Sequence, residues 1–148
     1  MTRAPAAIAR EARINARLQP GQARDAALAA NPPPAELAYL VEIIGAAATL
    51  RLIEEAGGTR IAIPKTVNQG TRLARMVGLD AARALAGWRG GEDVKVPLAR
   101  HWRIRIYHAE GGSYPAIARR LGITERAVHS NLAAARLTEP AQPDLFAG

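Results

Sequence analysis

Residues 113–136 read SYPAIARRLGITERAVHSNLAAAR, and this stretch decides how the rest of the chain is interpreted. Ser113 belongs to the residue types that cap helices, and Pro115 suits a first helical turn because that turn needs no backbone donor. Gly122 stands where a tight turn requires a positive φ. Thr124 can then cap a second helix. The spacing predicts two helices joined by a short turn.

The apolar positions of these two helices separate an inner face from an outer one. Apolar residues at spacings of three and four are predicted to face the core: Ile117, Ala118, Leu121, Ile123, Ala127, Val128 and Leu132. The second helix turns outward Thr124, Glu125, Arg126, His129, Ser130 and Ala133. Such an array can contact DNA phosphates and base edges. The pattern predicts a helix-turn-helix that binds DNA; the competing interpretation is an ordinary helical hairpin.

The charge of the chain also points to a polyanionic partner. The formal net charge is +7 at pH 7, and residues 99–137 hold seven arginines against two glutamates, a local net of +5. The planar fork of arginine suits phosphate and guanine edges. We therefore expect double-stranded DNA as the partner. The arginines assigned to the DNA surface are Arg103, Arg119, Arg120, Arg126 and Arg136.

Several classes of function find no support in the sequence. The chain has no cysteine, which excludes disulfides and thiolate metal sites and favours a cytoplasmic location. No apolar run reaches bilayer length, because Glu42 and Arg51 interrupt the best candidate, 37–53. The three histidines lack metal-ligand spacing, and no nucleophile elbow or phosphate loop is present. We expect no enzyme activity, metal, cofactor or membrane partner.

The middle of the chain repeats itself at a spacing of 33 residues. The matched segments are 40–45 with 73–78, 57–58 with 90–91, and 61–64 with 94–97. Each unit is predicted to be a helix, a glycine break, a second helix, a Gly-Gly pair, a short strand and a proline stop. The shared spacing indicates a duplication.

A three-residue strand cannot satisfy its own backbone groups and needs a partner. The strands of the two units can pair antiparallel with each other around a pseudo-twofold axis, or they can pair across a homodimer. The sequence leaves both arrangements open, so we expect either a homodimer or a monomer with an internal pseudo-dimer. The predicted fold is mainly α, with the duplicated units forming a two-stranded β-ribbon ahead of the helix-turn-helix.

Composition divides the chain into four parts. Residues 1–34 are expected to be a flexible or weakly docked Ala/Arg-rich arm that ends in a proline linker, and 35–97 form the duplicated region. Residues 98–137 form the DNA-binding domain, and 138–148 an extended tail. The first helix of the DNA-binding domain is predicted over 98–110, with Leu98, Trp102, Ile106 and Ala109 on one face and with Trp102 and Tyr107 as core anchors.

The tail carries a second candidate binding motif. Gln142, Leu145 and Phe146 resemble the bacterial sliding-clamp-binding pentapeptide, which begins with glutamine and ends with a Leu-Phe pair. Two adjacent large apolar residues in a terminal segment gain nothing from exposure to water. They are expected to bind the clamp or to pack on the core of this protein.

From Gly90 onward the chain combines the glycine pair Gly90-Gly91, the strand-proline segment 94–97, a helix with Arg103-Ile104-Arg105, the segment 107–112, and the helix-turn-helix segment 113–137. Residues 57–64 repeat the glycine-pair and strand-proline element. This pattern resembles the Mor transcription-activator family of Mu-like phages. The resemblance implies a phage or prophage protein of the bacterial cytoplasm. It also implies a homodimer with an intersubunit β-ribbon that binds promoter DNA, recruits host RNA polymerase and activates transcription.

By the same resemblance, the recognition helix carries Thr124, Glu125, Arg126, His129 and Ser130. The chain departs from the family pattern because the helix–strand unit occurs twice while one helix-turn-helix follows. Two other functions stay open. One is an adaptor that engages host replication machinery through the clamp-like tail. The other is a small-terminase-like packaging protein that assembles as a ring.

Overall fold

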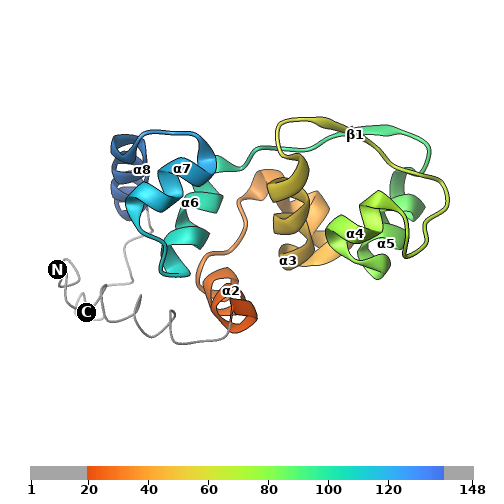
Figure 1. Ribbon diagram of the computed structural model, residues 1–148, viewed down its shortest axis with the longest axis horizontal. Coiled ribbons are helices and arrows are strands. Elements are labelled where there is room, and N and C mark those ends of the chain that lie inside the picture. Colours follow the sequence, from red (N-terminus) through yellow and green to blue (C-terminus); the bar gives the residue numbers. More distant parts are fainter. Residues whose placement is uncertain (1–19, 139–148) are drawn as a thin grey trace, which may run out of the picture.

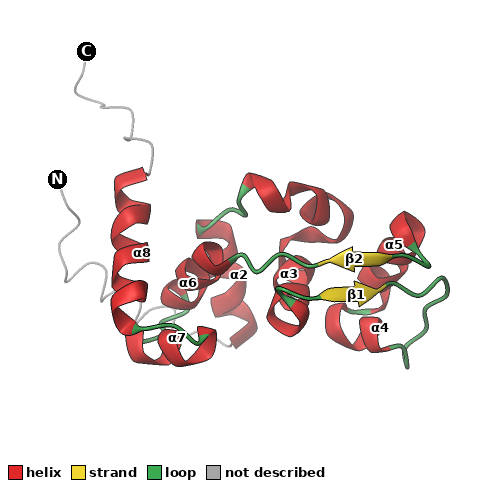
Figure 2. Cartoon of the chain, turned by 90° about the horizontal axis from the view of Figure 1, so that it is seen from above, coloured by secondary structure: helices red, strands yellow, loops and turns green. Residues whose placement is uncertain are grey.

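The computed structural model describes residues 20–138, which form a mainly helical fold with one small antiparallel sheet (Figure 1). The elements in chain order are α2 (Pro20–Ala30), the 3-10 turn η1 (Ala35–Leu37), α3 (Ala38–Ala56), β1 (Arg60–Ala62), α4 (Arg72–Val77), α5 (Leu79–Arg89), β2 (Asp93–Lys95), α6 (Arg100–Ala109), α7 (Tyr114–Leu121) and α8 (Glu125–Thr138). Helices α6, α7 and α8 gather at one end, while α4, α5 and the strands lie at the other (Figure 2). The expected mainly helical architecture is confirmed at this level.

The two strands pair with each other inside one chain. The antiparallel register joins Arg60 to Lys95, Ile61 to Val94 and Ala62 to Asp93. Two backbone bonds extend the ladder at its ends: Gly58 N–H donates to Val96 O at 2.8 Å, and Gly91 N–H donates to Ile63 O at 2.6 Å. The pairing supplies the partner that each short strand needs.

The glycines of the two units have matched backbone geometry. Gly45 interrupts α3 with φ 82° and ψ 163°, and Gly78 separates α4 from α5 with φ 91° and ψ 157°. The glycines that end the second helix of each unit also agree, with φ −53° and ψ 134° at Gly57 and φ −56° and ψ 132° at Gly90. A helix, a glycine break and a second helix therefore occur both within 38–56 and within 72–89.

The helices of the two units pack into one core. Helix α3 contacts both α4 and α5, and the Tyr39 ring at its start lies 5.9 Å from the Trp88 ring of α5. Four leucines that are at most 3 % exposed fill the space between these helices: Leu40, Leu52, Leu73 and Leu85. No helix within residues 20–138 is long and apolar enough to cross a membrane.

Residues 20–31 are packed rather than weakly attached, which corrects our expectation for this part of the arm. Helix α2 lies against α6 and α3, and the small side chains of Ala23 and Ala27 are buried one turn apart. Trp102 Nε1 donates a hydrogen bond of 2.9 Å to the carbonyl of Asn31, just after the helix. Residues 1–19 lie outside the described part of the chain.

Helix α6 begins two residues later than predicted. Ala99 adopts the left-handed conformation with φ 48°, so the helix starts at Arg100. Leu98 therefore lies before the helix and is 38 % exposed instead of buried. Trp102 and Tyr107 are core anchors as predicted, since they are 0 % and 2 % exposed.

The glycine breaks give a direct test of this fold. The backbone of Gly45 and of Gly78 lies in a region that is almost restricted to glycine, so Gly45→Ala and Gly78→Ala should each lower the free energy of unfolding by about 1–3 kcal/mol. Gly87→Ala is the control, because Gly87 lies inside α5 and an added Cβ would meet no atom within 4 Å. The control should be neutral or stabilise by up to about 1 kcal/mol. Urea denaturation of the three variants measures this, and equal effects at all three sites would contradict it.

Candidate nucleic-acid interface

Helices α7 and α8 are held by the caps and the turn that the sequence predicts. Ser113 Oγ accepts a hydrogen bond from the Ala116 N–H at 3.2 Å, and Thr124 Oγ1 accepts one from the Ala127 N–H at 3.1 Å. Gly122 takes the left-handed conformation between the helices, with φ 67° and ψ 36°. These contacts satisfy backbone groups that helix ends otherwise leave unpaired.

The inner face of the pair is apolar, with one exception to our prediction. Residues buried in the contact are Ile117, Ala118, Val128 and Leu132. Ala127 is exposed, although we expected it to face the core. The reason is the rotation of about 100° per residue along a helix, which turns Ala127 away from the contact that Val128 makes.

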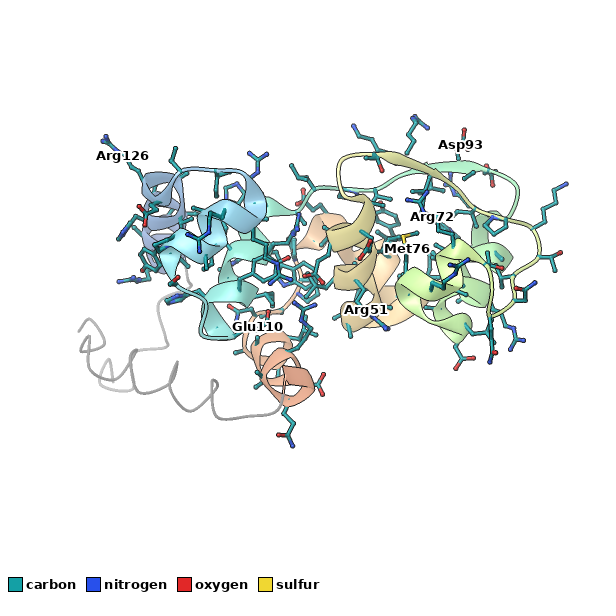
Figure 3. All side chains as sticks on the ribbon, in the orientation of Figure 1. Arg51, Arg72, Met76, Asp93, Glu110 and Arg126 are labelled. Carbon is teal, nitrogen blue, oxygen red and sulfur yellow. The ribbon has the colours of Figure 1, made fainter. Side chains whose placement is uncertain are left out.

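The outer face of α8 is polar and open to solvent. The exposed side chains are Thr124, Glu125, Arg126, His129 and Ser130, as predicted. Arg126 extends away from the body of the protein (Figure 3). Arg119 on α7 and Arg136 near the end of α8 are exposed as well. The structure thus brings eight of the nine residues proposed for DNA binding onto exposed positions of α8, its cap and α7, Arg120 on α7 included; the exception is Arg103.

A row of aromatic rings links α8 to the helices beneath it. The His129 ring meets the Tyr114 ring edge to face at a centroid distance of 4.2 Å, and Tyr114 meets His108 at 5.6 Å. Burial lowers the pKa of His108, and the charge of Arg136 lowers it further. Tyr114 thereby places the His129 ring at a defined position on the outer face of α8.

Arg103 is buried, which corrects its assignment to the DNA surface, and the exposed Arg120 is paired with groups of the protein itself. Arg103 is 8 % exposed, and its Nε donates a hydrogen bond of 3.1 Å to Tyr107 Oη. Arg120 lies over the Tyr107 ring at 3.8 Å from its centroid, and its Nη2 is 2.6 Å from Glu54 Oε2. Both guanidinium groups are engaged at the base of the helix pair. Sequence periodicity marks them as polar and cannot see the carboxylate that pairs with Arg120.

Glu54 is the acceptor at the centre of this cluster. Its Oε2 accepts hydrogen bonds from Tyr107 Oη at 2.8 Å and from Arg120 at 2.6 Å, while its Oε1 accepts one from Arg24 at 2.6 Å. Arg24 also bonds to Glu110 at 3.1 Å. One carboxylate of α3 therefore connects α2, α6 and α7. We name the five side chains the Glu54 cluster: Arg24, Glu54, Tyr107, Glu110 and Arg120.

The charges in the cluster stabilise one another. Burial alone would raise the pKa of Glu54, but the hydrogen bonds from Arg24 and Tyr107 and the charges of Arg24 and Arg120 outweigh it, so the pKa lies below its ordinary value. The pKa of Arg24 is shifted in the opposite direction: burial alone would lower it, but the hydrogen bonds and charges of Glu54 and Glu110 outweigh burial and raise it. Burial, together with Glu54, raises the pKa of Tyr107. Sequence reasoning missed Glu54; its one signal was a carboxylate one turn after the apolar Leu50.

A shallow hollow lies on another surface, beside α4. Helix α4 borders a shallow hollow of about 470 Å³ that is lined by Glu55, Arg72, Arg75 and Met76; Arg72 and Met76 are neighbours in Figure 3. Within residues 20–138, no three acidic or histidine side chains are placed to hold a metal ion. The clamp-like residues Gln142, Leu145 and Phe146 lie outside the described residues, as does the rest of the predicted tail from residue 139 onward.

Comparison of the chain with protein-family models, with curated proteins and with solved structures found no match. The likeness to the Mor family thus rests on the quoted sequence segments.

Replacing Glu54 should loosen the helix pair. Glu54→Gln removes the charge that three donors share, and we expect it to lower the free energy of unfolding by about 1.5–3 kcal/mol, the range for hydrogen bonds to charged groups. Glu55→Gln is the matched control, because the exposed Glu55 is the next residue on the same helix. Thermal and urea unfolding would measure both variants. A larger loss for Glu55→Gln would contradict the assigned role of the cluster.

The same variant should alter the response to acid. Because folding lowers the pKa of Glu54, its contribution to stability is present above the unfolded-state pKa of about 4.3 and is lost as the pH falls through the lower folded-state value. The difference in unfolding free energy between the wild type and Glu54→Gln should therefore be full at pH 7 and shrink below about pH 4. Urea unfolding at a series of pH values would show it. A difference that does not change with pH would contradict the pKa assignment.

Proposed function

We propose that this protein is a sequence-specific regulator of transcription that binds double-stranded DNA, of the Mor type and encoded by a phage or prophage, and that it acts as an activator. One observation carries the proposal: α8 presents a polar, arginine-bearing face to solvent while its other face is locked to α7. A helix held in this way can lie in the major groove without unfolding its own core. On this proposal, α7 and α8 are the helix-turn-helix.

The outer face of α8 divides into two roles. Arg126, with Glu125, His129 and Ser130, provides base contacts, since arginine and small polar side chains bond to base edges in the major groove. Arg119 and Arg136 provide phosphate contacts, which supply affinity by releasing counterions from the duplex. Thr124 combines its role as a helix cap with a position at the start of the recognition helix, where backbone N–H groups favour phosphate.

The matched geometry of the two units supports a duplication. Equivalent glycines share their backbone angles, and equivalent residues of the two strands are hydrogen-bonded neighbours at the centre of the ribbon. We propose that residues 35–97 form an internal pseudo-dimer that supports one helix-turn-helix. The partners implied by the resemblance are promoter DNA and host RNA polymerase in the bacterial cytoplasm. Contact of Gln142, Leu145 and Phe146 with the sliding clamp stays a separate proposal.

The base-contact role of Arg126 can be tested by substitution. Arg126→Ala should weaken binding to the preferred duplex by about 1–3 kcal/mol and reduce the preference over a random duplex. Arg83→Ala is the charge-matched control, because Arg83 is exposed on α5, far from α8. Fluorescence anisotropy on a duplex selected from a random pool would give both affinities. Equal losses on preferred and random duplexes would make Arg126 a phosphate contact.

A phosphate contact behaves differently in salt. Arg119→Ala should weaken binding to every duplex alike and should reduce the slope of log affinity against log salt by about 1. The measurement is anisotropy at several salt concentrations, with Arg83→Ala again as the control. An unchanged slope would remove Arg119 from the DNA surface, and a chain that selects no duplex from the pool would overturn the proposed function.

A further inference from the structure

We infer that one chain binds DNA alone, through a single helix pair, at a short site without twofold symmetry. The inference rests on the proposed function and adds the class of DNA site and the stoichiometry. The two units are related by the 33-residue shift, but they differ at the face that carries Glu54 in the first unit.

The ribbon occupies the pseudo-twofold axis within the chain. Ile61 and Val94, which are equivalent under the shift, face each other at its centre. The flanking bonds occur as equivalent pairs: Ile63 N–H donates to Glu92 O at 2.9 Å, and Val96 N–H donates to Thr59 O at 2.8 Å. In a homodimer, two chains would each supply one strand of such a ribbon. Here one chain supplies both strands.

The face that holds the helix pair exists on one unit only. Glu54 on α3 bonds to α2, α6 and α7. Its equivalent in the second unit, 33 residues later, is Gly87, which is exposed and has open space where a side chain would begin. The second unit has no carboxylate at the position that would dock another helix pair.

A second position on the same face has diverged in the same sense. Leu50 lies one turn before Glu54 and is fully buried, whereas its equivalent Arg83 is exposed. A buried apolar residue at Leu50 fits a face that is covered in the first unit, and a solvated cation at Arg83 fits a face that is open to water in the second. We therefore assign the docking site to Leu50 and Glu54 of the first unit. The equivalent site of the second unit, at Arg83 and Gly87, is open.

The chain path agrees with this asymmetry. Strand β1 leads on to α4 of the second unit, while β2 leads on to α6 and the helix pair. Both views place α6, α7 and α8 at one end and α4 and α5 at the other, with α3 between the two groups, and none of the described helices lies beyond α4 and α5 (Figures 1 and 2). One helix pair is attached to a pseudo-symmetric support, so the DNA-reading surface has no twofold symmetry.

The asymmetry determines the kind of site. Dimeric helix-turn-helix proteins read two half-sites about 10 base pairs, or a multiple of that, apart, and the symmetry of the site mirrors that of the protein. A single helix pair reads one half-site. The preferred sequence should therefore lack inverted symmetry, and a second copy of the site should bind independently.

The test uses the full wild-type chain and duplexes selected from a random pool. Native mass spectrometry should show one 15.7 kDa chain on each single-site duplex, and the aligned sequences should show no inverted repeat. Anisotropy should then compare a duplex that carries the site once with one that carries it as an inverted repeat. For independent sites the second duplex should bind about twofold better, the statistical factor alone, without the coupling that cooperative sites show.

The contrary outcomes are distinct. Two chains on one selected site, a palindromic preference, or a gain of more than about tenfold on the inverted repeat would overturn the inference and leave the proposed function standing. If no duplex is enriched over the random pool, the proposed function and the inference both fail. Enrichment of a duplex from the pool is measured first, and the number of chains per duplex is measured second. Failure of the proposed function is therefore distinguished from failure of the inference alone.

Discussion

Two strands of three residues each persist in this protein because each satisfies the backbone groups of the other. Neither strand could be stable alone, since unpaired N–H and C=O groups away from water cost about as much free energy as a lost hydrogen bond. Pairing β1 with β2 brings the ends of α3 and α5, the helices that precede the strands, to the same ribbon, and the positive φ of Gly45 and Gly78 marks the breaks within α3 and between α4 and α5. The described helices are arranged around this ribbon.

The connection between that support and the candidate DNA surface is electrostatic. Glu54 receives hydrogen bonds from three elements that are distant in sequence, and Arg24 extends the cluster to Glu110. Such a cluster combines direction with attraction, because hydrogen bonds to charged groups depend on angle as well as on distance. It therefore sets the orientation of α7, and through α7 that of α8, relative to the ribbon.

The candidate DNA surface was predictable where local rules apply and less so where contacts between distant residues decide. Ser113, Gly122 and Thr124 could be assigned because capping and turn conformation depend on a few neighbouring residues. Arg103 and Arg120 were assigned to DNA by their charge, yet each is held by Tyr107 or Glu54. A sequence shows that an arginine is polar; it does not show which carboxylate or ring reaches it first.

The sequence alone predicted the helical character, the two glycine breaks and the pair of short strands. It also predicted the caps of α7 and α8 and the outward face of α8. These features were predictable because hydrophobic periodicity and residue conformation depend on a few neighbouring positions. The tertiary structure alone decided that the strands pair within the chain, that α2 packs on α6, and that Glu54 joins three helices. These features depend on which distant groups meet. That choice depends on the packing and the charge balance of the whole molecule, which no local pattern contains.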